Sequence, residues 1–186
     1  MNDLQALEQA YRNAERVIAA VTPDDYGRPT TCTEWDVRAL LDHMIGAITI
    51  FPAMLRGEPP DLDRDFVGSD PASSFRAEVE PNLEAWRAPG ALESTTEFLP
   101  GVRLVELNVC DSVVHTWDLA TSTDQGGALP DDLAERTYSQ VREWPLEISR
   151  SSGAFGPEIP LTEGASVGDR LLALLGREPR AGGRSS

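Results

Sequence analysis

Residues 34–55 read EWDVRALLDHMIGAITIFPAML, and this stretch decides the fold class. Its apolar residues recur at intervals of three and four, which is the period of a helix with one broad apolar face. Thr33 is the expected N-cap, and the acidic residues of the first turn suit the positive end of the helix dipole. Gly57 and the prolines at 59 and 60 would end the helix, so we expect a central helix over residues 34–55. Its apolar face comprises Val37, Leu40, Leu41, Met44, Ile45, Ile48, Phe51 and Leu55.

Five segments outside this stretch are also expected to be helical. They show the same period or open on a pair that favours a helix start, as Asp70 and Pro71 do. The expected helices cover residues 3–21, 71–87, 101–121, 130–149 with an interruption near Pro145, and a short stretch within 166–176. Residues 91–101 could be extended instead. The pattern predicts an all-α, up-and-down helical bundle with extra short helices and an irregular C-terminal arm.

Length and charge narrow the classes of protein and partner. A chain of 186 residues favours one domain, which we expect over residues 1–180, followed by a disordered tail over 181–186. The net charge of −15 argues against nucleic acid or an anionic membrane as partner, because both would repel the protein. The longest apolar stretch, residues 44–55, is short for a membrane span and contains Pro52. The N-terminus has acids where a signal peptide needs basic and apolar residues, so we expect a cytoplasmic protein.

The cysteines and tryptophans are first interpreted as structural. We expect Cys32 and Cys110 to be buried thiols rather than a disulfide, because a reducing compartment disfavours the bond. Trp35 is assigned to the first turn of the central helix, and Trp117 to the core.

The chain has only two histidines, and both fall in its most apolar expected helices. Asp111 and His115 are four residues apart, so on a helix they project from nearly the same face. Together with His43 they would form a three-ligand metal site inside the bundle, with an open position of the kind found in catalytic zinc sites. The alternative is that a carboxylate or carbonyl satisfies each buried imidazole without any metal.

Three stretches carry a resemblance to a known family: TTCTEWDVRALLDHMIG at 30–46, VVHTWDLA at 113–120 and FGPEIPLTEGASVGDRLLALLGREP at 155–179. In combination they resemble the DinB-like, mycothiol-dependent maleylpyruvate isomerase superfamily of actinobacteria, in particular its short single-domain members. The resemblance implies a four-helix bundle whose divalent metal is held by a histidine of the second helix and two ligands one turn apart on a later helix. By position these are His43, Asp111 and His115. The family usually has His/His or Glu/His as the later pair, so Asp111 departs from the pattern with a shorter side chain.

The resemblance also implies a chemistry. Zinc or nickel would bind at the site, and the thiol of mycothiol would bind the metal for transfer to a small electrophilic substrate, with thiol transfer expected before isomerisation. Asp118 would support a metal-bound histidine as a hydrogen-bond acceptor. A homodimer is a further expectation from the resemblance. The alternative function is a non-catalytic module that binds a small molecule, or dimerises, on the same scaffold without metal.

Overall fold

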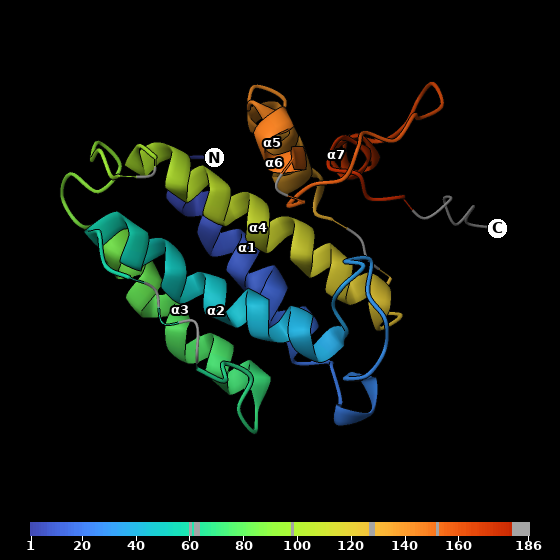
Figure 1. Cartoon of the computed structure of the whole chain (residues 1–186), viewed down its shortest axis with the longest axis horizontal. Coiled ribbons are helices and arrows are strands. Elements are labelled where there is room, and N and C mark those ends of the chain that lie inside the picture. The colour runs from blue at the N-terminus through green and yellow to red at the C-terminus, as the bar shows by residue number, and fades with distance from the viewer. Residues whose placement is uncertain (60, 62–63, 98, 127–128, 152, 180–186) are drawn as a thin grey trace. The chain divides into compact units, whose positions relative to one another are not determined.

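The computed structural model describes residues 1–59, 61, 64–97, 99–126, 129–151 and 153–179. The chain folds into two compact units, Met1–Ala128 and Leu129–Ser186. Within the described residues the regular structure is helical, apart from two isolated β-bridges, which confirms the all-α prediction (Figure 1). The single domain over residues 1–180 stays a prediction, and the expected tail at 181–186 lies outside the described residues.

The described part of the first unit contains four long helices with well-defined ends. The side chains of Asn2, Asp36 and Asp70 cap the first three by accepting hydrogen bonds from backbone N–H groups of the first turn. Gly57 ends the second helix in the left-handed conformation, with φ of 69°, which glycine adopts without strain. The four helices are α1 (Asp3–Ile18), α2 (Val37–Arg56), α3 (Pro71–Arg87) and α4 (Gly101–Ser122).

The start of α2 differs from the sequence prediction. Asp36, and not Thr33, is the N-cap, because the backbone N–H of Trp35 donates to the carbonyl of Cys32 and closes a turn just before the helix. The first helix also ends at Ile18, three residues earlier than expected, and a short 3-10 helix, η1 (Pro23–Asp25), follows it. Residues 33–35 therefore belong to the connection between α1 and α2.

The order of the helices around the bundle explains the path of this connection. α1 packs against α3 and α4, and α2 packs against the same two helices. Hence α1 and α2 occupy opposite corners, and the chain between them must cross one end of the bundle (Figure 1). The crossing is anchored to α4 and its C-cap region by Arg28, which pairs with Asp124, and by Thr31, which donates to Asp118.

The apolar stretch at residues 34–55 supplies nearly all of α2, and most of this helix is buried. Eleven of its residues are buried, among them Leu40, Leu41 and Ile45. Gly46 allows Phe66, from the segment after α2, to pack against the helix, because a Cβ there would lie 3.0 Å from the phenyl ring. By length and composition alone α2 could cross a membrane, but most of it is buried inside the bundle, as a core helix would be.

Among residues 129–151 and 153–179, the second unit contains three shorter helices. The longest, α5, packs against α7, and the side chains of Ser166 and Asp169 cap the start of α7. Part of the expected irregular arm lies along the end of α7, where Ile159 N–H donates to the carbonyl of Ala173. The helices are α5 (Asp131–Val141), α6 (Leu146–Ser151) and α7 (Val167–Leu174), so the expected helix over 130–149 is two helices separated near Pro145.

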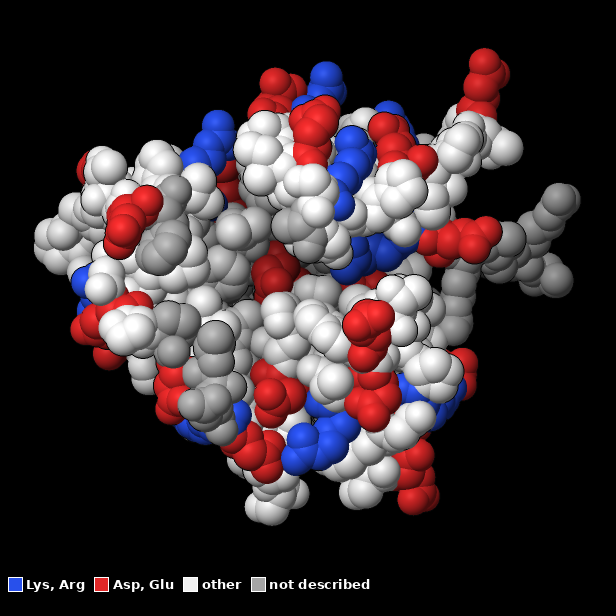
Figure 2. All heavy atoms as spheres, in the orientation of Figure 1, with Lys and Arg blue, Asp and Glu red and all other residues white. Residues whose placement is uncertain are grey.

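Charged side chains of both signs are interspersed on the face of the molecule shown in Figure 2. Several charged side chains form ion pairs between helices, as Arg87 does with Glu8 and Arg76 with Glu15. Exposed pairs of this kind contribute little to stability, typically 0–1 kcal/mol. The excess of acidic residues thus gives a solvated surface and does not indicate any particular activity.

Candidate metal centre

The three predicted ligands lie together in the first unit. Asp111 Oδ1 on α4 is 3.1 Å from His43 Nε2 on α2 and 3.6 Å from His115 Nε2 one turn further along α4. All three side chains are half-buried, with His43 the most exposed at 30%. The shorter side chain of aspartate therefore does bring a carboxylate oxygen to both imidazoles.

The spacing of these atoms fits a metal ion. A tetrahedral ion about 2.1 Å from each donor holds neighbouring nitrogen and oxygen donors about 3.4 Å apart. The two distances that Asp111 makes fall on either side of that value, and the three donor atoms all lie within 4.8 Å of one another. Two imidazoles and one carboxylate suit zinc and other divalent ions of similar size.

Asp118 lies behind His115 and is completely buried. Its Oδ2 is 2.9 Å from His115 Nδ1, and its Oδ1 accepts a hydrogen bond from Thr31. With the Nδ1 proton donated to this carboxylate, the lone pair of His115 is on Nε2, the nitrogen that faces Asp111 and His43. This is the arrangement by which a carboxylate fixes the tautomer of a metal-binding histidine.

The connection between α1 and α2 adds two side chains that the sequence analysis did not assign to the site. Cys32 Sγ lies 3.5 Å from Asp118 Oδ2 and 3.9 Å from His115 Nδ1. Trp35 stacks over both histidines, with its ring centroid 4.6 Å from that of His43 and 5.7 Å from that of His115. Cys32 is only half-buried, and it forms no disulfide with the buried Cys110.

Cys32, His115 and Asp118 form a second group of possible metal ligands, whose donor atoms also lie within 4.8 Å of one another. It shares His115 with the first group but uses Nδ1 in place of Nε2. The imidazole of His115 therefore has one group of possible metal ligands near Nε2 and a second group near Nδ1.

Comparison with known proteins identifies the family. The sequence pattern of the mycothiol maleylpyruvate isomerase N-terminal domain matches residues 7–120, which include most of α1, all of α2 and α3, nearly all of α4 and every residue of the site. The chain belongs to this family.

The sequence similarity to two relatives extends beyond the family domain. Two proteins of Mycobacterium tuberculosis, both named as uncharacterized, from strains CDC 1551 / Oshkosh and H37Rv, are each 29% identical over 187 residues. Each comparison covers 97% of this chain and all of the relative, so it includes the second unit as well. No solved structure matches the chain.

The electrostatics of this family member favour a positive charge at His43. Burial lowers the pKa of His43, but the hydrogen bond with Asp111 and the charge of that carboxylate oppose it. The carboxylates of Asp118 and Asp42 add to the effect, and the net result is a pKa above the ordinary 6.5. The same negative surroundings would favour a divalent cation in place of the proton.

This raised pKa gives the site an expected pH dependence. A metal can bind only the neutral imidazole, so below the pKa of His43 a proton must leave for each ion that binds. We expect metal affinity to be level above that pKa and to fall about tenfold per pH unit below it, with the fall beginning above pH 6.5. Competition titrations with a chromophoric chelator from about pH 5.5 to 8 would measure this. Affinity that does not change over this range would contradict the assignment of His43 as a ligand.

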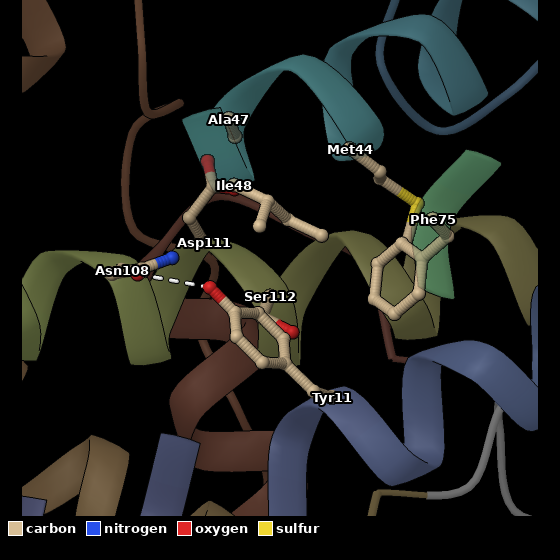
Figure 3. A pocket seen from close by; sticks show the side chains of 8 residues that line it. All are labelled: Tyr11, Met44, Ala47, Ile48, Phe75, Asn108, Asp111 and Ser112. Carbon is tan, nitrogen blue, oxygen red and sulfur yellow. Dashed lines mark hydrogen bonds between the residues drawn. The ribbon is translucent and has the colours of Figure 1, made fainter. Parts of the chain in front are cut away.

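A small cavity lies next to Asp111 in the bundle core (Figure 3). The cavity offers about 10 Å³ to the centre of a water molecule. It can therefore hold one water molecule and is too small for a larger ligand. Its lining comes from all four helices and comprises Tyr11, Met44, Ala47, Ile48, Phe75, Asn108, Asp111 and Ser112.

Asn108, one turn before Asp111, is the centre of a buried polar network. Its Oδ1 is within hydrogen-bond distance of Tyr11 Oη at 3.0 Å, Asn82 Nδ2 at 3.2 Å and Trp86 Nε1 at 3.2 Å. Burial raises the pKa of Tyr11 well above its usual value, although the hydrogen bond with Asn108 lowers it, so the phenol stays protonated and donates. The network ties α1 and α3 to the turn of α4 that carries Asp111.

We expect Asn108→Ala to destabilise the first unit by about 2–3 kcal/mol, because the buried donors of Tyr11 and Trp86 lose their acceptor and Asn82 Nδ2 keeps just its bond to the carbonyl of Ile48. Chemical denaturation followed by circular dichroism would measure the loss. Thr123→Ala at the end of α4 is the control, since it removes two half-buried local hydrogen bonds, one to the carbonyl of Leu119 and one from Gln125 Nε2. Equal stability of the two variants would show that the network contributes nothing specific.

Proposed function

We propose that this protein is a metal-dependent enzyme of the maleylpyruvate isomerase type, most simply a transferase that joins a low-molecular-weight thiol to a small electrophile. The observation that carries the proposal is the convergence of His43, Asp111 and His115 from two helices on one position. Three protein ligands leave room for a further ligand from solvent or substrate, which is a feature of catalytic rather than structural metal sites.

The metal would be zinc or nickel, and when bound it would supply Lewis acidity that lowers the pKa of a thiol or water ligand. The protein's own residues prepare the position. Asp118 holds His115 in the tautomer that turns Nε2 toward the site, and Asp111 supplies negative charge beside both imidazoles. Trp35 forms an apolar wall over the histidines, which would keep water away from one side of the reacting groups.

Mycothiol is the thiol that the family name suggests. The partners we propose are therefore a small thiol and a small electrophile, and not nucleic acid or a membrane, in a cytoplasmic and homodimeric protein. The side chains described next to the two histidines are the carboxylates of Asp111 and Asp118 and the indole of Trp35. The negative charge of these carboxylates favours a neutral or cationic electrophile over a dicarboxylate, and hence transfer over maleylpyruvate isomerisation.

A second candidate function is a small-molecule-binding module without metal. The observation in its favour is that each histidine already has a carboxylate partner, His43 with Asp111 at 3.1 Å and His115 with Asp118 at 2.9 Å. A buried imidazole with such a partner is satisfied without any ion.

Elemental analysis of untagged protein separates the two functions. Under the first proposal we expect one zinc or nickel per chain, or full recovery of that amount when the metal-free protein is given either ion. The loaded protein should then consume mycothiol in the presence of a panel of small electrophiles, with maleylpyruvate among them. If neither ion binds tightly, and if the protein still binds small ligands, the module without metal is the better description.

A further inference from the structure

His115 faces two sets of donor atoms, and a neutral imidazole can serve only one of them at a time. Nε2 faces Asp111 at 3.6 Å, while Nδ1 lies 2.9 Å from Asp118 and 3.9 Å from Cys32. One ring nitrogen carries the proton and the other the lone pair. A metal bound to Nδ1 on the Cys32 side would therefore leave the imidazole proton on Nε2. Nε2 could then no longer bind the metal that the proposed function requires.

The two sulfur distances of the Cys32 group fit a metal that prefers sulfur, while His115 Nδ1 and Asp118 Oδ2, now 2.9 Å apart, would separate slightly to bind it. A tetrahedral ion bound to sulfur at about 2.3 Å and to nitrogen or oxygen at about 2.1 Å holds the sulfur about 3.6 Å from each of the other donors. The observed distances from Cys32 Sγ are 3.5 Å to Asp118 Oδ2 and 3.9 Å to His115 Nδ1. The donors of this group are one thiol, one imidazole and one carboxylate, whereas the first group contains no sulfur.

Cys32 is held in place by the backbone around it. Its N–H donates to the hydroxyl of Thr30, its carbonyl accepts from Trp35 N–H, and Thr30 also donates to the carbonyl of Trp35. The adjacent Thr31 is fixed to Asp118. The thiol is thus positioned beside Asp118 by the folded connection, and its partial exposure leaves it accessible to an ion from solvent.

We propose that Cys32, His115 and Asp118 form an inhibitory binding site for soft, thiophilic divalent ions such as Cd²⁺, which excludes the catalytic metal because both positions need His115. On binding, the thiol of Cys32 releases its proton to solvent, and the imidazole proton moves from Nδ1 to Nε2 through exchange with solvent. No electrons are transferred. The claim that the ion inhibits the protein rests on the proposed function. The competition between the two metal positions does not depend on it.

The test uses the full-length protein with Co²⁺ as the probe of the first site and Cd²⁺ as the probe of the second. We expect Cd²⁺ to bind at one ion per chain with the ultraviolet charge-transfer band of a metal-bound thiolate, and to displace an equal amount of Co²⁺. Cys32→Ala should lose the band and weaken the displacement at least tenfold, while Co²⁺ affinity stays within about threefold. Cys110→Ala is the matched control, because it removes the other thiol of the chain and should keep both the band and the displacement.

Three results would overturn this inference: no thiolate band in the unmodified protein, a band that survives in Cys32→Ala, or Co²⁺ and Cd²⁺ bound together at two ions per chain. A failure of the proposed function looks different. In that case Co²⁺ does not bind, whereas Cd²⁺ still binds through Cys32 with its band. If Co²⁺ binds and Cd²⁺ gives no band, the proposed function stands and the inhibitory site is wrong.

Discussion

Replacing His115 with alanine is expected to abolish tight metal binding. The helical spacing places this imidazole beside Asp111, and its contact with the buried Asp118 holds its orientation. Its loss leaves two ligands, so we expect the affinity for zinc or nickel to fall at least 10³-fold, which is about 4 kcal/mol of binding free energy. Isothermal titration or competition with a chelator would measure the change.

Two further variants make this result interpretable. Glu106 lies on the same helix and pairs with Arg103 outside both donor groups. The metal affinity of the Glu106→Ala variant should therefore equal that of the unmodified protein. His43→Ala should lose the metal to a similar extent while leaving the contact between His115 and Asp118 intact. Full metal occupancy in either histidine variant would show that the ligand set is wrong.

The second large effect is expected for Asp118→Ala, which should impair both folding and metal binding. Asp118 is fully buried and has Thr31, Cys32 and His115 as hydrogen-bond partners. Its removal leaves these groups without their buried acceptor and frees the connection between α1 and α2, so we expect a loss of about 3–5 kcal/mol in unfolding free energy. Because the Nδ1 proton loses its partner, metal affinity should also fall about 10–100-fold.

Asp124→Asn is the matched control for this variant, because Asp124 has a φ of 57°, a left-handed conformation that asparagine tolerates better than alanine. Asp124 also anchors the connection, through Arg28, but its side chain is 69% exposed. We expect this substitution to change stability by no more than about 1 kcal/mol and to leave metal affinity unchanged. Urea denaturation and metal titration of both variants would measure the difference. Similar stability losses in the two would mean that Asp118 acts only as one of several loop anchors.

The helices and the Asp111–His115 pair could be predicted from the sequence because both depend on short-range spacing. The apolar period of residues 34–55 indicated α2, and the four-residue interval between Asp111 and His115 placed both on one face of α4. His43 was added as the other histidine in an apolar helix and by the family resemblance, because the packing of α2 against α4 that brings it to Asp111 does not follow from spacing. What the sequence could not supply was the distance at which the shorter aspartate side chain would meet the two imidazoles.

The contributions of Cys32 and Trp35 could not be predicted in this way. Their positions depend on α1 and α2 occupying opposite corners, which forces the connection to cross α4 beside His115. Helical period carries no information on which helices are neighbours. The one available signal was proximity in sequence, since both residues lie in the same run, TTCTEWDVRALLDH, as His43.

The same ambiguity explains the displaced start of α2. Thr33 and Asp36 are both residues that cap helices well, so local preference does not choose between them. The choice is made by the turn that Trp35 N–H closes on Cys32 and by the stacking of Trp35 on His43. These contacts hold the tryptophan outside the helix, above the candidate site.

The most direct measurement is a crystal structure of the protein loaded with zinc, with anomalous scattering recorded on both sides of the zinc absorption edge. We expect a single anomalous peak within bonding distance of His43 Nε2, Asp111 Oδ1 and His115 Nε2, with the Nδ1 of His115 still hydrogen-bonded to Asp118. A peak at Cys32 and Nδ1 of His115 instead, or no peak between α2 and α4 at full zinc saturation, would contradict the assignment of a catalytic metal to these three residues.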